Sequence, residues 1–283
     1  METNFYKRRQ LTNIVMSRLM GICALICVAM FLVVMFHIVT NGIGALNIDF
    51  FTQLPKPYGE EGGGVAQAIL GTVYMLIVAS LISVPIGVAT AIYCVEYNEY
   101  KMASIIRFSI MLISSLPSIV VGIFVWALWV SVFGYSGFAG SLALSIIMIP
   151  IIERGTEEDL LLIDDSIRES AIDLGIRQWK AIIYVILPSI RPALITIVMQ
   201  AVARAAGETA PLLLTALGNQ FFNFDLSQPT SAIPLQIYNY AVSPYEDWHN
   251  KAWGLILILV VLMGTTQVLL RIFTRRNNHA KRD

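Results

Sequence analysis

Asp164-Asp165-Ser166-Ile167-Arg168-Glu169-Ser170-Ala171-Ile172-Asp173-Leu174-Gly175 lies within residues 153–190, a segment between two apolar runs. Ser166 and Glu169 have the Ser-x-x-Glu spacing of a capping box, which starts a helix. Three residues then recur four and three positions apart, as on one face of a helix: Ile167, Ala171 and Leu174. We therefore predict a short amphipathic helix that begins near Ser166 and stops near Gly175.

A helix lying in the membrane surface is the alternative interpretation of this segment. Such helices favour Lys and Arg, which face anionic lipid. The segment is instead acidic, with Glu157, Glu158, Asp159, Asp164 and Asp165. The charge pattern therefore favours a helix that contacts another protein.

Long apolar runs lie on both sides of this segment. Apolar residues make up 57% of the 283 residues and charged residues 13%, whereas soluble domains have roughly 45–50% and roughly 25%. A helix needs roughly 20 apolar residues to cross about 30 Å of hydrocarbon. Runs near that length lie at 19–39, 65–95, 105–133, 138–152, 192–217 and 252–273. We predict an all-α integral membrane protein with six transmembrane helices, the fourth short because nothing obvious extends it beyond Pro150.

The basic residues fix the direction of these spans. If the amino terminus is cytoplasmic, sixteen of the nineteen Lys and Arg residues fall in cytoplasmic segments, two lie outside and Arg204 lies within a span. The positive-inside rule then places both termini in the cytoplasm. The predicted division is a cytoplasmic segment 1–18, a transmembrane domain 19–273 and a cytoplasmic tail 274–283. The first apolar run is longer than the apolar region of a signal peptide, which has roughly 7–15 residues, so we expect the run to be retained in the protein.

Two longer external segments, 40–64 and 218–251, are rich in Gly, Pro and aromatic residues. They are either solvated loops or a docking surface for a soluble partner. The three cysteines, Cys23, Cys27 and Cys94, fall in apolar runs, and we expect them to be small buried hydrophobic residues. The three histidines join no nucleophile or ligand constellation, so we predict no metal site, no cofactor and no catalytic residue.

The segment 153–190 resembles the cytoplasmic signature of ABC importer permeases. Glu169-Ser170-Ala171, three residues, Gly175, nine residues, then Val185, one residue and Leu187-Pro188 is similar to the family pattern E-A-A, G, I-x-L-P. Ser170 and Val185 depart from it conservatively. The resemblance implies that this coupling segment forms helices that dock into a groove of an ATPase subunit, through Glu169, Ser170, Ala171, Gly175, Leu187 and Pro188.

A closer resemblance, over about residues 50–273, is to the PstA-type permeases of phosphate importers. It rests above all on Ala205-Ala206-Gly207-Glu208-Thr209-Ala210-Pro211-Leu212. Further stretches add to it: Gly71-Thr72, Pro85-Ile86-Gly87, Glu96-Tyr97 and Leu116-Pro117-Ser118-Ile119-Val120-Val121-Gly122. The resemblance implies import of inorganic phosphate in a complex with a sister PstC-type permease, two ATPase subunits and a periplasmic or extracellular phosphate-binding protein. No nucleic acid partner is expected.

No ATP site is visible in the sequence, because a Walker loop needs Gly-Lys and this dipeptide does not occur in the chain. The energy source must then be another polypeptide. Two rival classes stay open: an ion-coupled secondary transporter, which would show interrupted helices in two symmetric halves, and a membrane sensor or scaffold without transport. An ABC permease for another oxyanion is a further alternative.

Arg204 and Glu208 are the charged residues that lie well inside the predicted spans. At 100° per residue, one face of the fifth span is polar and carries Thr196, Gln200, Arg204, Gly207, Glu208, Pro211 and Thr215. Charges within a membrane usually face a cavity or a partner. Arg204 and Glu208 are therefore either a structural salt bridge at i and i+4 or part of a substrate path.

The serines around Pro117 are weaker candidates for the same path. Ser114, Ser115 and Ser118 could present hydroxyls where proline frees backbone groups, or could simply satisfy the helix backbone. The predicted substrate path comprises Arg204, Glu208, Gln200, Thr209 and Ser118.

Overall fold

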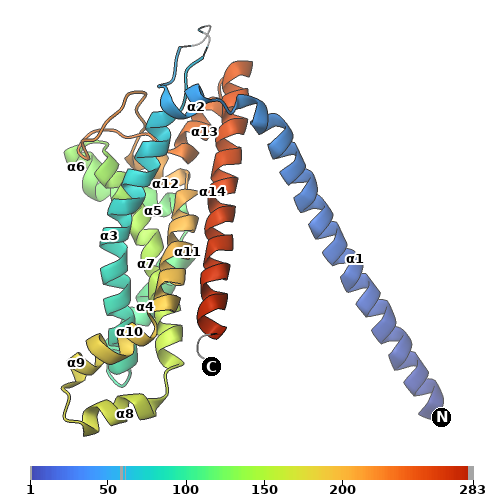
Figure 1. The fold of residues 1–283 in the computed structure, drawn as a ribbon, viewed down its shortest axis with the longest axis vertical. Helices are drawn as coiled ribbons and strands as arrows, with labels where there is room; N and C mark the ends of the chain where they lie inside the picture. The colour runs from blue at the N-terminus through green and yellow to red at the C-terminus, as the bar shows by residue number, and fades with distance from the viewer. Residues whose placement is uncertain (1, 58–59, 61, 280–283) are drawn as a thin grey trace.

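The computed structural model describes residues 2–57, 60 and 62–279 and shows a bundle of long helices (Figure 1). The long helices are α1 (Glu2–Gly42), α3 (Ala66–Glu96), α7 (Gly137–Leu161), α11 (Arg191–Ala206) and α14 (Glu246–His279). α1 leans away from the others, which stand side by side. Residues 280–283 of the predicted tail lie outside the described residues.

Shorter elements connect these helices. At the end of the bundle where α1 joins it lie η1 (Ile43–Ala45), α2 (Ile48–Thr52) and α13 (Ile233–Ala241). At the opposite end lie α8 (Asp165–Asp173), α9 (Gln178–Ala181) and α10 (Leu187–Ser189), with the π-turn η3 (Ile182–Ile186) between the last two. The remaining elements are α4 (Lys101–Ser115), α5 (Ser118–Val125), the π-turn η2 (Trp126–Val130), α6 (Ser131–Phe133) and α12 (Ala210–Thr215).

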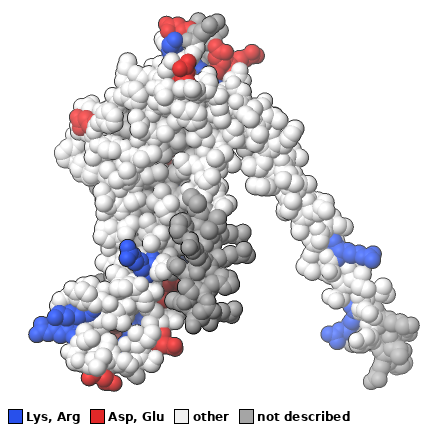
Figure 2. Space-filling model, viewed as in Figure 1, with Lys and Arg blue, Asp and Glu red and all other residues white. Residues whose placement is uncertain are grey.

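The structure has four unbroken helices that could span a membrane, and reaches the predicted six if two bent helix pairs each count as one span. Four helices are long and apolar enough to cross a membrane unbroken: Arg9–Ala45, Ala66–Glu96, Gly137–Leu161 and Glu246–Val268. Two helix pairs qualify if each counts as one span: Lys101–Ser115 with Ser118–Phe133, and Gln178–Ser189 with Arg191–Ala206. Figure 2 shows a wide uncharged zone between two ends that carry the visible charged side chains.

The predicted third span, 105–133, is wrong as a single helix. It breaks at Leu116 and Pro117, where α4 and α5 meet at 105°. Proline has no N–H to continue the helix, and its ring keeps the preceding residue out of the α region. Leu116 accordingly has φ −71° and ψ 137°, which is extended backbone.

The fourth span is longer than the predicted 138–152. α7 continues through Pro150 to Leu161, because a proline inside a helix removes one hydrogen bond without ending the helix when tertiary packing holds it. The first part of the segment 153–190 is therefore helix rather than loop, and Glu153 and Leu160 are each only 1% exposed.

The fifth span, predicted as 192–217, is also interrupted. α11 ends at Ala206, and α12 begins only at Ala210. Gly207 is a weak helix former, and Pro211 lacks the N–H that would bond to the Gly207 carbonyl. The polar face drawn through Thr215 is therefore wrong beyond Ala206, and Pro211 and Thr215 are buried.

The short amphipathic helix predicted near Ser166 is confirmed as α8, Asp165–Asp173. Of its predicted apolar face, Ala171 is 5% exposed, whereas Ile167 is 42% and Leu174 79% exposed. The capping box cannot be followed further, since the side chain of Glu169 lies outside the described residues. Part of the apolar face thus points away from the bundle.

The second external segment is not a solvated loop throughout. α13 folds back into the bundle, where Ile233 and Leu235 are almost fully buried, and Ile233 N donates to Thr72 Oγ1 on α3 at 2.7 Å. Residues 223–228 form a hydrogen-bonded turn: Ser227 donates to Asp225 from its backbone and its hydroxyl, which lowers the pKa of Asp225 below its ordinary value.

The expectation of three buried cysteines holds only for Cys94. Cys23 and Cys27 are exposed on α1, which touches the rest of the chain mainly where it joins α14 and η1. Most of the apolar side chains along α1 are exposed as well. In a membrane, lipid or another subunit would cover them.

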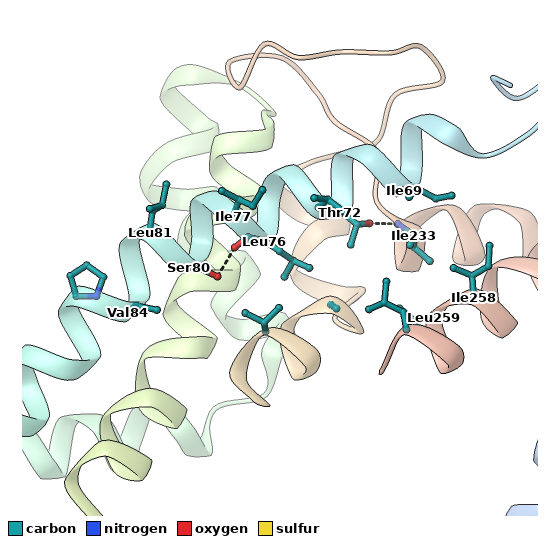
Figure 3. Close-up of a pocket in the computed structure, with 15 residues that line it drawn as sticks. Ile69, Thr72, Leu76, Ile77, Ser80, Leu81, Val84, Ile233, Ile258 and Leu259 are labelled. Atoms are coloured by element: carbon teal, nitrogen blue, oxygen red, sulfur yellow. Dashed lines mark hydrogen bonds between the residues drawn. The ribbon is translucent and has the colours of Figure 1, made fainter. Parts of the chain in front are cut away.

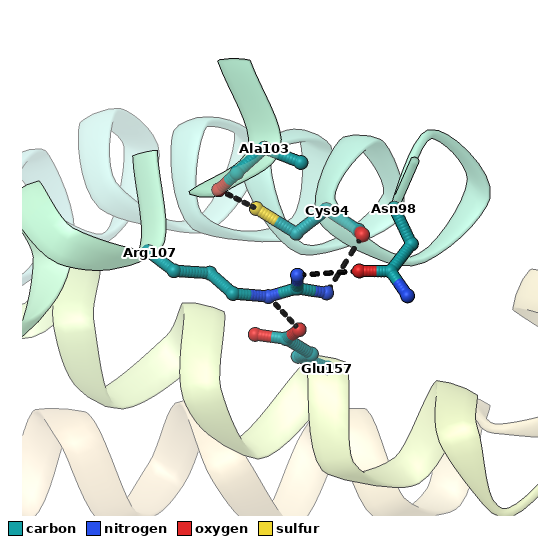
Figure 4. A network of polar contacts seen from close by, with 5 residues as sticks. All are labelled: Cys94, Asn98, Ala103, Arg107 and Glu157. Carbon is teal, nitrogen blue, oxygen red and sulfur yellow. Dashed lines mark hydrogen bonds and ion pairs between the residues drawn. The ribbon is translucent and has the colours of Figure 1, made fainter. Parts of the chain in front are cut away.

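A charged clamp ties α3, α4 and α7 together at the end of the bundle that carries α8 and α9 (Figure 4). Arg107 on α4 donates from Nε to Glu157 Oε1 on α7 at 2.6 Å, and from Nη2 to the Cys94 carbonyl on α3 at 2.8 Å. Its Nη1 donates to Asn98 Oδ1 at 2.6 Å. An arginine can hold three partners because its guanidinium presents five N–H donors in a fixed plane.

The amino-terminal end of α3, at the opposite end of the bundle, is held by close backbone contact instead. A Cβ added at Gly71 would overlap the Ser231 carbonyl oxygen and lie 2.9 Å from Thr230 Cγ2. In membrane proteins, small residues allow such close approach where apolar burial supplies little driving force. Gly71 thus lets the predicted external segment 218–251, called the outer segment below, pack against α3.

We predict that Gly71→Ala destabilises the protein by roughly 1–3 kcal/mol, because a buried backbone oxygen cannot move aside cheaply. Gly264→Ala on α14 is the matched control, since an added Cβ there meets nothing within 4 Å. Thermal unfolding of the purified chain in detergent measures both. An unchanged midpoint for Gly71→Ala would show that the outer segment does not pack on α3 as described.

Candidate substrate path and coupling segment

A polar cavity of about 350 Å³ lies where the α4–α5 break and the α11–α12 interruption meet α7. From the α4–α5 break come Ser114, Pro117 and Ser118, and from the α11–α12 region Arg204 and Glu208. α7 contributes Ile147, Pro150, Ile151 and Arg154. The structure thus brings together three of the predicted path residues, Ser118, Arg204 and Glu208.

Packing between α5 and α12 holds the two breaks next to each other. A Cβ added at Gly122 on α5 would lie 2.8 Å from Pro211 Cα on α12, so the two backbones are in direct contact. The amino end of α5 borders the cavity at Ser118, and helix amino ends carry a partial positive charge. The local fold therefore brings the amino end of α5, serine hydroxyls and arginine guanidinium groups to the same cavity.

Arg204 and Glu208 form no ion pair, although their spacing allowed one. The ion pairs among the described residues join Arg107 to Glu157 and Arg168 to Glu96. The i, i+4 geometry is lost because α11 ends at Ala206, so Glu208 lies in the break rather than one helical turn above Arg204. Both side chains line the cavity instead.

Arg154 is a second cationic residue of the cavity and was missed in the sequence. It was counted as cytoplasmic because the fourth span was expected to end near Pro150. α7 in fact continues, and a residue four positions after Pro150 lies on the same face of the helix. Pro150 and Arg154 both line the cavity, so this spacing was the available signal.

Two other predicted path residues do not line this cavity. Gln200 is exposed on α11, one turn before Arg204, and Thr209 is half-buried in the break. Ser115 is also outside, and its hydroxyl donates to the Leu112 carbonyl at 2.8 Å, which satisfies the helix backbone. A role for Gln200 and Thr209 stays a prediction.

The cavity is chemically suited to an oxyanion. Guanidinium groups bind phosphate-like oxygens in a planar fork and keep their charge when partly desolvated. Ser114 and Ser118 add hydroxyl donors. Within the described residues, no group of three or more His, Cys, Asp or Glu side chains is arranged to hold a metal ion.

A second cavity is larger but unsuited to a charged ligand (Figure 3). It has about 710 Å³ between α3, α11, α13 and α14, and its lining includes Leu76, Ile77, Leu81 and Ile258. Its hydroxyls are already used, since Thr72 accepts from Ile233 N and Ser80 donates to the Leu76 carbonyl at 2.7 Å. An anion would lose its hydration there without compensation.

The coupling segment ends the bundle on the side opposite α2 and α13. Gly175 has φ +75°, which glycine adopts at no steric cost and other residues rarely adopt, so the chain can turn from α8 toward α9. Leu162 and Leu174 are 83% and 79% exposed at this end. Ser170 is exposed beside them.

The second half of the coupling segment packs on the bundle. Ile182, Ile186 and Ile190 form an apolar cluster with Ala91 of α3 and Leu160 of α7, and Leu187 packs against it. Pro188 lies in α10, which leads directly into α11. This half is therefore anchored, while Leu162 and Leu174 of the first half are exposed and can meet a partner.

Comparison with known proteins agrees with this geometry. Residues 83–279 match the family described as binding-protein-dependent transport system inner membrane component. The chain is 40% identical over 242 residues to the phosphate transport system permease protein PstA of Haemophilus influenzae, covering 85% of this chain and 86% of that protein. It is 37% identical over 276 residues to the PstA of Xylella fastidiosa strain 9a5c, covering 95% and 96%.

Among solved structures, the chain shares its fold with a protein described as the MetNI methionine ABC transporter in inward-facing conformations. The TM-score is 0.61 at 17% sequence identity, covering 75% of this chain and 95% of that one. This likeness concerns the fold alone.

We predict that a cysteine at Ser118 reacts faster with an anionic than with a cationic thiol reagent of equal size. The two arginines attract anions to the cavity, and such fields change encounter rates by roughly tenfold or more. Ser131→Cys, exposed on α6 outside this cavity, is the matched control and should show no preference. Labelling rates in a cysteine-free background decide the matter, and a preference for the cationic reagent at Ser118→Cys would contradict the described cavity.

Proposed function

The chain belongs to the family of binding-protein-dependent transport system inner membrane components, and we propose that it is the PstA-type permease subunit of an ABC importer for inorganic phosphate. Its curated relatives named PstA are 35–40% identical over most of its length. The observation that carries the proposal is the meeting of Arg154, Arg204 and Ser118 in one polar cavity between bent spans.

The cavity compensates the free-energy cost of bringing a phosphate anion into an apolar helix bundle. An uncompensated anion pays many kcal/mol to enter an apolar bundle. Two guanidinium groups supply opposite charge and donors that match phosphate oxygens. Glu208 lies in the same cavity and keeps its net charge low between transport events. Phosphate is accordingly bound both by the positive charge of the two guanidinium groups and by the match between their N–H donors and its oxygens.

The energy comes from a separate ATPase. The chain has no Gly-Lys dipeptide and hence no Walker loop of its own. Its coupling segment presents Ser170, Leu174 and Leu162 at the end of the bundle, and these exposed residues suit a groove of the ATPase. The full importer comprises a sister PstC-type permease, two ATPase subunits and an external phosphate-binding protein.

The complex lies in the inner membrane with both termini of this chain in the cytoplasm. The basic residues at the α8–α9 end and on the free end of α1 support this direction, since cytoplasmic segments carry an excess of Lys and Arg (Figure 2). The opposite end, with α2, α13 and the turn at 223–228, then faces the binding protein.

We predict that Arg204→Gln lowers phosphate uptake by about 100-fold, because a charge-assisted contact in a partly desolvated site contributes up to roughly 3 kcal/mol. Arg204→Lys keeps the charge but loses the planar fork, and should lower uptake by about tenfold. Assembly of the complex should be unchanged in both variants. The measurement is ATP-dependent phosphate uptake into vesicles that contain the whole complex. Sulfate is added as a competing oxyanion to test selectivity. An uncoupler tests whether uptake depends on an ion gradient instead of ATP.

Two further variants separate a substrate contact from a structural role. Arg191→Gln, at the other end of α11 and outside the cavity, is the matched control and should transport normally. Arg204→Gln with Glu208→Gln should stay inactive, because the two residues are not paired in the structure. Near-normal uptake by this double variant would show that Arg204 serves only to balance Glu208.

We predict that a cysteine at Ser227 is labelled by an impermeant thiol reagent from outside intact cells, and that one at Asp164 is labelled only after the membrane is opened. Both positions are exposed and at opposite ends of the bundle. Labelling of Asp164→Cys in intact cells would reverse the orientation.

A further inference from the structure

Glu96 lies at the inner end of α3 and contacts both helices of the coupling segment. Its Oε1 forms an ion pair with Arg168 Nε on α8 at 3.4 Å, and its Oε2 accepts from Gln178 Nε2 on α9 at 3.4 Å. The side chain of Glu96 is only 9% exposed and that of Arg168 19%. One largely buried carboxylate therefore joins α3 to α8 and α9.

Arg168 extends this connection to α7. Its Nη2 donates to the Leu160 carbonyl at 2.9 Å and its Nη1 to the Ile163 carbonyl at 3.5 Å. These carbonyls lie at the carboxyl end of α7, where a cation is favoured by the helix dipole and by carbonyls that lack helical partners. α8 is thus attached to the ends of two core helices through a single guanidinium.

α3 runs from this point to the outer face of the bundle. At its outer end, Thr72 Oγ1 accepts from Ile233 N, and Tyr74 OH donates to the Phe224 carbonyl at 2.8 Å. Over its middle it packs against α7, with Met75, Leu76, Ala79 and Val88 in the main apolar cluster. A displacement of its inner end would therefore reach the outer segment along one helix.

We propose that Glu96 and Arg168 are positioning residues that make α8 and α9 move together with α3, so that movement of the ATPase is transmitted to the outer segment. The inference rests on the proposed function, in which the coupling segment docks on an ATPase. The inference adds to that function the contacts of Glu96 with Arg168 and Gln178, through which a displacement of the docked segment would reach the membrane spans. Rigid helices with defined attachments are the elements that carry such coupling.

The apolar contacts around Glu96 make the proposal testable without unfolding the protein. Ile182 and Ile186 pack on Ala91 and Leu160 beside it, and these contacts remain when Glu96 becomes glutamine. Glu99→Gln is the matched control. Glu99 is three residues further along the chain and exposed, so the same chemical change there leaves the connection intact.

The experiment compares phosphate uptake with ATP hydrolysis in the same vesicles, using the complete complex. Glu96→Gln and Arg168→Gln should each lower the phosphate taken up per ATP hydrolysed by about tenfold, the size of a typical allosteric coupling. The double variant should lose less than the two single losses combined, because both single variants remove the shared Glu96–Arg168 ion pair. Glu99→Gln should match the parent.

The ratio of uptake to hydrolysis distinguishes positioning from structural support. A merely structural role would lower complex yield, uptake and hydrolysis in proportion and leave the ratio unchanged. An unchanged ratio in Glu96→Gln, or losses that add in the double variant, would overturn the proposal.

Hydrogen exchange of the same complexes separates this inference from the proposed function. Amides of α8 and α9 should exchange faster in Glu96→Gln than in the parent, while those of α11 stay unchanged. If the parent complex takes up no phosphate, the proposed function fails, and exchange alone then decides whether Glu96 holds the segment. Equal exchange in parent and variant would show that it does not.

Discussion

Every backbone polar group in the hydrocarbon region must find a partner, and the rest of this structure depends on that constraint. Helices may break at that depth only where protein or a water-filled cavity receives the freed groups. The break at Leu116–Pro117 and the interruption between α11 and α12 at residues 207–209 lie together, because α5 and α12 pack through Gly122 and Pro211. The polar cavity is the consequence, since the two interruptions and α7 enclose it.

The sequence predicted where the apolar helices lie better than where they break or end, because apolar length is a property of the chain itself. It predicted α8 within about two residues for a similar reason, since a helix start and a glycine stop are local signals. It failed where the outcome depends on tertiary contact. Pro117 breaks a helix while Pro150 does not, and the difference lies in what packs around each residue. α13 was taken for loop because its burial against α3 is not local.

The site residues were also predicted only in part, because some of their signals are local and others depend on tertiary contacts. Arg204 and Glu208 were recognisable because charges are rare in apolar runs. One of the two alternatives, a salt bridge between them, assumed a continuous helix, and the break at Gly207 removes that geometry. Arg154 was missed because a span was ended at proline, so the residue was placed in water. Charge alone therefore identifies candidates, whereas helix continuity decides which of them share a cavity.

The two ends of α3 are attached by different kinds of contact, and the membrane explains why. The outer end uses the close approach of backbone to Gly71, and the inner end uses the carboxylate of Glu96 and the guanidinium groups of Arg107 and Arg168. An ion pair is costly to desolvate fully but forms readily near the headgroups, where long side chains reach water. The hydrogen bonds from Arg168 to the Leu160 and Ile163 carbonyls are directional, so they hold the angle of α8 as well as its distance. Tight backbone packing at the other end leaves α3 little freedom to slide there, and a displacement at Glu96 must then tilt the whole helix.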